Sequence, residues 1–89
     1  MKHIVKRGKH TEKYDERKLY ASMFAACIAV RVPQQEAELV AKQVCQDVSN
    51  WLADKHEVTA GDIHRQAAKH LRAYNPDAGY IYDTHREIS

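Results

Sequence analysis

The chain has 89 residues, of which 44% are hydrophobic and 29% are charged, and its formal net charge is +2. These values are ordinary for one globular domain with a modest core; they leave no room for a large catalytic apparatus, and no apolar run approaches membrane-spanning length. We therefore expect a single cytoplasmic domain over residues 1–89. Cys27 and Cys45 belong to no C-x-x-C pair, so we expect reduced thiols in or near the core and no structural zinc.

The positive charge is concentrated near the N-terminus. Up to Lys18 the chain holds seven Lys or Arg and three acidic residues, whereas the remainder holds seven basic and nine acidic residues. Local clusters of cationic residues commonly bind phosphate groups. A charged, solvated surface without a ligand would have the same composition.

The cationic cluster surrounds an expected tight turn. The apolar pair Ile4-Val5 precedes Lys6-Arg7, and Gly8-Lys9 can form a type II′ turn, whose first central position favours glycine. Residues 10–14 can return as a second strand. Because a bare two-stranded hairpin is marginal alone, we expect it to lie on the helices that follow.

Four helices are expected after the hairpin. Asp15 can cap the first, Val32-Pro33 ends it, and the second runs from Pro33 to about Lys55. Residues 56–58 form a short connector. Each helix has an apolar face. In the first helix the expected apolar face consists of Leu19, Met23, Ala26, Cys27 and Val30, and in the second it consists of Ala37, Val40, Val44, Val48 and Trp51.

The third helix is expected to begin with a capping box formed by Thr59 and Asp62, and Asn75-Pro76 should start the fourth. The expected apolar faces are Ile63, Ala67 and Leu71 in the third helix, and Tyr80, Ile81, Thr84 and Ile88 in the fourth. The predicted fold class is thus α+β, an N-terminal β-hairpin packed on a bundle of four helices.

Two motifs resemble the ATP-cone, the regulatory nucleotide-binding domain of ribonucleotide reductases and of their transcriptional repressor. In the first, the family has an apolar residue, Lys-Arg, a turn, Glu, an aromatic-Asp pair and Lys before an aliphatic residue. The matching residues are Val5, Lys6, Arg7, Glu12, Tyr14, Asp15, Lys18 and Leu19. The second is the Val58-Thr59 pair before Ile63 and His64. The turn departs from the family, which prefers Asp-Gly where this chain has Gly8-Lys9.

The resemblance implies that ATP or dATP, with Mg²⁺, binds beneath the hairpin. Val5 and Ile63 would contact the adenine, and Glu12 would hydrogen-bond an amino or hydroxyl group. The residues that would contact the triphosphate are Lys6, Arg7, Lys9 and Lys18. The start of the third helix would offer amides to the phosphates. The implied nucleotide-contacting residues are Val5, Lys6, Arg7, Lys9, Glu12, Lys18, Thr59, Ile63 and His64.

No catalytic pattern accompanies these motifs. The sequence contains no G-x-x-x-x-G-K-[ST] and no Cys or His arrangement with catalytic spacing. We therefore expect a non-enzymatic, stand-alone sensor that binds ATP or dATP and signals through a protein partner or a second copy.

The alternative is a protein-interaction module that kept the fold but lost the nucleotide, which the altered turn and Gly61-Asp62 favour. We do not expect nucleic-acid binding, because the pI of about 8.6 is modest and aromatic residues do not alternate with the basic ones.

Overall fold

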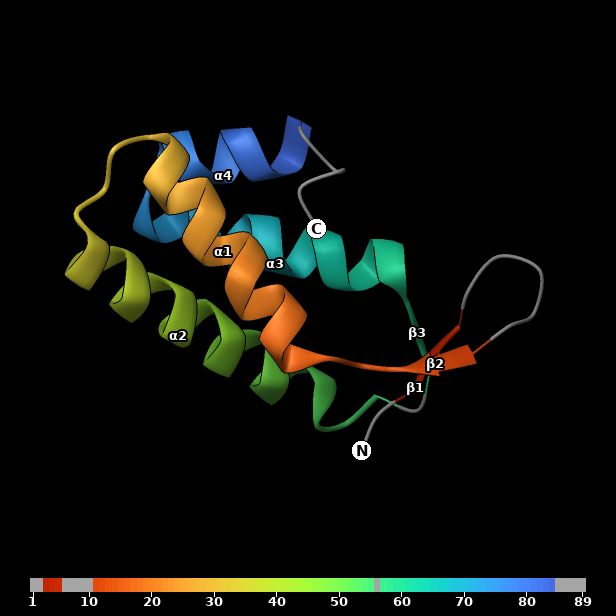
Figure 1. The fold of residues 1–89 in the computed structure, drawn as a ribbon. Coiled ribbons are helices and arrows are strands. Elements are labelled where there is room, and N and C mark those ends of the chain that lie inside the picture. Colours follow the sequence, from red (N-terminus) through yellow and green to blue (C-terminus); the bar gives the residue numbers. More distant parts are fainter. Residues whose placement is uncertain (1–2, 6–10, 56, 85–89) are drawn as a thin grey trace.

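The structure, a computed structural model, describes residues 3–5, 11–55 and 57–84, with side chains from residue 14 onward. In chain order its elements are β1 (His3–Val5), β2 (Thr11–Lys13), α1 (Glu16–Ala29), α2 (Gln34–Leu52), β3 (Val58–Thr59), α3 (Ala60–Tyr74) and α4 (Pro76–Thr84). Each helix packs against its chain neighbour, and α4 returns to contact α1, so the four helices close into a bundle with the strands at one end (Figure 1).

The expected fold class, α+β with a β-hairpin packed on a four-helix bundle, is wrong. The four helices are present and hold 14, 19, 15 and 9 residues, against strands of 3, 3 and 2, so the described chain is largely helical. The strands are not a hairpin lying on the bundle. They form a small sheet of order β2-β1-β3 beyond the helix ends (Figure 1).

The third strand is the element that the sequence did not reveal. Residues 56–58 were expected to be a connector, yet Val58 pairs in parallel with Ile4 while β1 also pairs antiparallel with β2. A strand of two residues has no periodicity to recognise, and its existence depends on a partner distant in the sequence. The expected turn at Gly8-Lys9 lies outside the described residues.

The end of α1 also differs from the expectation, because proline is not what stops it. Arg31 adopts a left-handed conformation with φ of 65°. Its N–H donates to the Ile28 carbonyl, and the N–H of Val32 donates to the Cys27 carbonyl. This is a Schellman motif, and it satisfies carbonyls that the helix end would otherwise leave open. Pro33 then stands at the N-cap of α2, not inside it.

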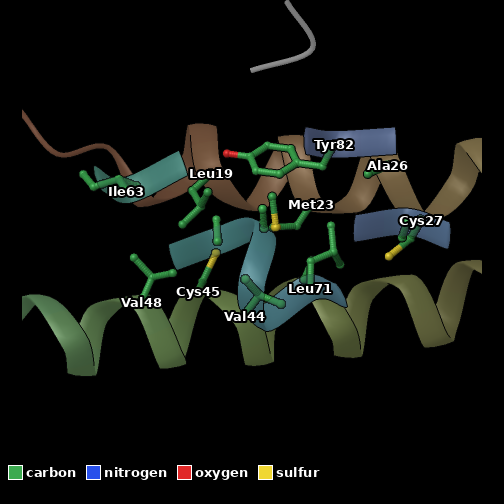
Figure 2. Packing of buried hydrophobic residues seen from close by; sticks show 14 of the residues in the cluster. Leu19, Met23, Ala26, Cys27, Val44, Cys45, Val48, Ile63, Leu71 and Tyr82 are labelled. Carbon is green, nitrogen blue, oxygen red and sulfur yellow. The ribbon is translucent and has the colours of Figure 1, made fainter. Parts of the chain in front are cut away.

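The core lies between all four helices, and its largest fully buried side chains are Met23, Leu71, Val44, Val48 and Cys27 (Figure 2). Both cysteines are free and buried, as expected. The expected apolar face of α4 is only partly confirmed. Ile81 packs against the core, but Tyr80 is 65% exposed, and the buried residues are Ala78, Gly79 and Tyr82. The reason is the close approach of α4 to α3, which only a glycine permits at position 79. Ile88 lies outside the described residues.

Candidate functional site

The candidate site lies where the sheet meets the start of α3. In the parallel ladder Val5 is opposite Thr59, and Thr59 is also the N-cap of α3. Lys6-Arg7 follow Val5 directly in the sequence. The parallel pairing of β1 with β3 thus brings together the two motifs, which are far apart in the sequence.

The expected capping box at the start of α3 is confirmed. Thr59 Oγ1 accepts a hydrogen bond of 3.0 Å from the Asp62 N–H, and the Asp62 carboxylate accepts one of 3.0 Å from the Thr59 N–H. The guanidinium of Arg65 donates to the same carboxylate. The Thr59 N–H, assisted by Arg65, holds the pKa of Asp62 below its usual value, so this carboxylate is ionised near neutral pH.

Ile63 and His64 follow the capping box and take different environments. Ile63 is 6% exposed and belongs to the core of the bundle, where Figure 2 shows it at the edge of the cluster. The ring of His64 stacks on Tyr82 of α4, with centroids 4.4 Å apart. Its Nε2 lies 3.4 Å from Asp83 Oδ1. His64 is therefore held between the start of α3 and the end of α4.

Asp83 connects two residues of α3, and neither this residue nor Tyr82 was a predicted site residue. One carboxylate oxygen lies near His64, and the other accepts a hydrogen bond of 3.4 Å from Arg72. These contacts depend on how α4 packs on α3. Because nothing in the local sequence around Asp83 specifies a partner eleven or more residues earlier, sequence reasoning had no signal for them.

The other predicted site residues are only partly described. Lys18 is exposed in the first turn of α1, on a different helix from Thr59, Ile63 and His64. The backbones of Val5 and Glu12 belong to β1 and β2. Lys6, Arg7 and Lys9 lie outside the described residues, so their predicted contacts remain predictions.

The described part of the site offers one exposed hydroxyl and one apolar side chain. Thr59 offers an exposed hydroxyl, and Ile63 offers an apolar side chain at the margin of the core. However, the carboxylate of Asp62 already occupies the amide end of α3, where an anion would otherwise bind.

Within 3–5, 11–55 and 57–84, no group of three or more His, Cys, Asp or Glu could hold a metal ion. In the same part of the chain, no helix combines the length and the apolar character needed to cross a membrane.

Comparison with known proteins gives one match. Residues 2–84 match the ATP cone domain family, which covers both motifs and all four helices. No curated protein and no solved structure matches the chain.

Proposed function

The chain belongs to the ATP-cone family, and from this membership we propose that it is a regulatory domain that binds ATP or dATP at the sheet end of the bundle. The observation that supports this placement is the pairing of Val5, the residue before Lys6-Arg7 in the sequence, with Thr59 at the start of α3. In this proposal the nucleotide is an effector, and binding changes how the domain associates with protein.

Each side of the site has a distinct role in the proposal. Lys6, Arg7 and Lys9, with Lys18, neutralise the phosphates, helped by Mg²⁺ carried on the nucleotide. Val5 and Ile63 contact the adenine, and Glu12, Thr59 and His64 contact polar groups of the base or ribose. Because Asp62 is ionised, the triphosphate is directed away from the first turn of α3 and toward the basic segment.

The contact of His64 with Asp83 suggests how binding is transmitted. A nucleotide that draws the imidazole away from Asp83 would weaken one of the two links between this carboxylate and α3, the other being Arg72. Occupancy of the site would then change the position of α4 relative to α3. This gives the domain the two states that regulation by a ligand requires.

One observation favours a second candidate function, an interaction module without nucleotide. The capping box uses the amides of Thr59 and Asp62 and adds a negative charge at the helix start. Both effects lower the attraction of the described site for phosphate.

The decisive test is calorimetric titration of the protein with ATP and dATP, each with and without Mg²⁺, and with GTP for comparison. We expect adenine nucleotides to bind, and Lys6→Ala to weaken binding at least tenfold, about 1.4 kcal/mol. Lys69→Ala is the matched control, because Lys69 is an exposed lysine of α3 outside the site and its removal changes the net charge equally.

The outcomes separate the two candidates. If Lys6→Ala loses affinity and Lys69→Ala does not, the proposed site at the sheet end of the bundle is supported. Equal losses of affinity in both variants would indicate only a general effect of charge. If the unaltered protein shows no binding of ATP or dATP at millimolar concentration, the regulatory proposal is wrong and the interaction module takes its place.

A further inference from the structure

Polar side chains from α2 and α3 converge on the face where these two helices meet. Gln43 and Asp47 are one turn apart on α2. His70 and Tyr74 are one turn apart on α3, so they lie side by side on that helix. We call these four residues the α2–α3 cluster. His70 comes eleven residues after Thr59, roughly 16 Å along α3, so the cluster is separate from the proposed nucleotide site.

The carboxylate of Asp47 is the centre of the α2–α3 cluster. Its Oδ2 accepts a hydrogen bond of 2.9 Å from the Tyr74 hydroxyl and lies 3.6 Å from His70 Nδ1. Its Oδ1 accepts a hydrogen bond of 3.1 Å from the side-chain amide of Gln43. Gln43 thus orients the carboxylate so that Oδ2 faces α3, where a phenol oxygen and an imidazole nitrogen stand beside it.

The separations of these three atoms match those of ligands that share one metal ion. With metal–ligand bonds of about 2.0–2.2 Å, neighbouring ligand atoms lie roughly 2.8–3.6 Å apart in octahedral or tetrahedral geometry. The distances from Asp47 Oδ2 to the Tyr74 hydroxyl and to His70 Nδ1 both fall in this range. The second distance is longer than a direct hydrogen bond, so the imidazole is set back from the carboxylate by the span of a shared ion.

The donor set selects a transition-metal ion. An imidazole nitrogen suits Zn²⁺ and its neighbours, whereas Mg²⁺ and Ca²⁺ prefer sites made of oxygen ligands. Desolvation and the hydrogen bond to Asp47 raise the pKa of the Tyr74 hydroxyl, so without a metal it stays protonated and donates to the carboxylate. A bound cation has the opposite effect on this pKa, and the phenol releases its proton to solvent when its oxygen becomes a ligand.

The α2–α3 cluster is partly open to solvent. The side chains of His70 and Asp47 are 31% and 21% exposed, and Tyr74 is 46% exposed. An ion can therefore enter without unfolding of the bundle, and water can fill a coordination position that the protein leaves open. The cluster contains one His and one Asp, so it differs from a group of three or more His, Cys, Asp or Glu, which the described residues do not form.

We propose that the α2–α3 cluster binds a divalent transition-metal ion of the Zn²⁺ class, with Asp47 Oδ2, His70 Nδ1 and the Tyr74 phenolate oxygen as ligands. Gln43 holds the carboxylate in place, and a water molecule completes a tetrahedral site. The ion joins α2 to α3 and stabilises the folded state by mass action. This inference goes beyond the proposed function, in which none of these residues contacts the nucleotide.

The test is titration of the full chain with ZnCl₂ in the absence of nucleotide, followed by calorimetry and by ¹H–¹⁵N NMR. We expect one ion to bind per chain, with the largest chemical-shift changes at the amides of the α2–α3 cluster. Asp47→Asn and His70→Ala should each weaken binding at least tenfold, because each variant lacks one ligand. Mg²⁺ at the same concentration should produce no such changes.

Matched controls separate the site from general effects of charge and of aromatic hydroxyls. Asp54→Asn removes the same charge from an exposed position near the end of α2, and Tyr80→Phe removes the hydroxyl of an exposed tyrosine on α4. Both should bind Zn²⁺ with the affinity of the parent. Tyr74→Phe retains the ring and lacks only the ligand oxygen, so it should weaken binding at least threefold. Because Asp47→Asn retains the size of the side chain, circular dichroism should show an intact fold.

Thermal unfolding gives an independent measurement, since Zn²⁺ should raise the unfolding temperature of the parent but not that of Asp47→Asn. The inference is overturned when millimolar Zn²⁺ does not bind, when the largest shifts lie outside the α2–α3 cluster, or when Asp47→Asn binds as tightly as the parent. Unchanged affinity in Tyr74→Phe excludes the phenolate and likewise overturns the three-ligand site. These measurements contain no nucleotide, so failure of this inference is distinguishable from failure of the proposed function.

Discussion

Gly79 of α4 lies directly over the backbone of Arg72 in α3. A Cβ added at Gly79 would stand 2.6 Å from the Arg72 Cα and 2.8 Å from its backbone nitrogen. No side-chain rearrangement can relieve a contact with backbone atoms, so the close packing of these two helices depends on the absence of a side chain at this position. The same packing brings Tyr82 and Asp83 to His64.

Gly79→Ala should therefore destabilise the protein by about 1–3 kcal/mol, because α4 must move away from α3. The control is Gly61→Ala, whose Cβ would meet nothing closer than 3.6 Å. In the first turn of α3, alanine is a better helix former than glycine, so this control should be neutral or gain up to about 1 kcal/mol. Urea denaturation measures both; a Gly79→Ala protein as stable as its parent would contradict the close approach.

Replacing Arg31 should stabilise the protein. The residue has φ of 65°, a conformation that glycine adopts without strain. Arg31→Gly should raise the free energy of unfolding by about 0.5–1 kcal/mol. Arg31→Ala serves as the control, because alanine retains the Cβ and thus the strain, and it should give no such gain. Equal effects of the two substitutions would show that the conformation carries no cost.

Ile63 is expected to be mainly a structural residue. With 6% of its surface exposed, Ile63→Ala should lower the free energy of unfolding by roughly 2–5 kcal/mol. Leu39, which is 69% exposed on α2, provides the contrast, and Leu39→Ala should change stability by no more than about 0.5 kcal/mol. Thermal unfolding followed by circular dichroism distinguishes them. A fully stable Ile63→Ala protein would mean that this face of α3 contributes little to the core.

The capping box should make stability depend on pH in the acid range. Since the pKa of Asp62 is lowered in the folded protein, its stabilising effect is fully present above the ordinary carboxyl pKa. The effect is lost as the pH falls from that value through the lowered one. Asp62→Asn should therefore reduce stability at neutral pH and make the acid-induced loss shallower. Parallel curves for the two proteins between pH 2 and 6 would show that Asp62 is not preferentially ionised by folding.

The sequence predicted those features that local chemistry determines. Asp15 accepts from the N–H groups of Arg17 and Lys18, and Asn75 accepts from that of Ala78, because short polar side chains before a helix satisfy its open amides. The Thr59–Asp62 capping box belongs to the same class. The apolar faces of α1, α2 and α3 also followed from helical spacing.

The features that were missed depend on packing between distant segments. The buried face of α4 is set by contact with Arg72, so Tyr82 is buried and Tyr80 is exposed, contrary to the spacing argument. The contact of His64 with Asp83 and the strand at Val58 have the same origin. For the site, the sequence identified the two motifs but not the strand pairing that brings them together. Val58 and Thr59 are β-branched and favour a strand, but a run of two residues is too short to predict one.

The parallel pairing of β1 with β3 also has a consequence for the order of folding. The α1–α2 and α3–α4 pairs are formed by helices adjacent in the chain. In contrast, β1 pairs with β3 although β2, α1 and α2 lie between them in the sequence. Closing so long a loop has a large entropic cost, and the short β1–β3 ladder offsets little of it. We expect amide hydrogens of the sheet to exchange faster than those of Met23 or Leu71 in the core. We therefore expect the sheet to open while the helices stay folded. A ligand that bridges β1 and α3 would slow the exchange of the sheet amides, and it would raise the free energy of global unfolding by the same mass-action term.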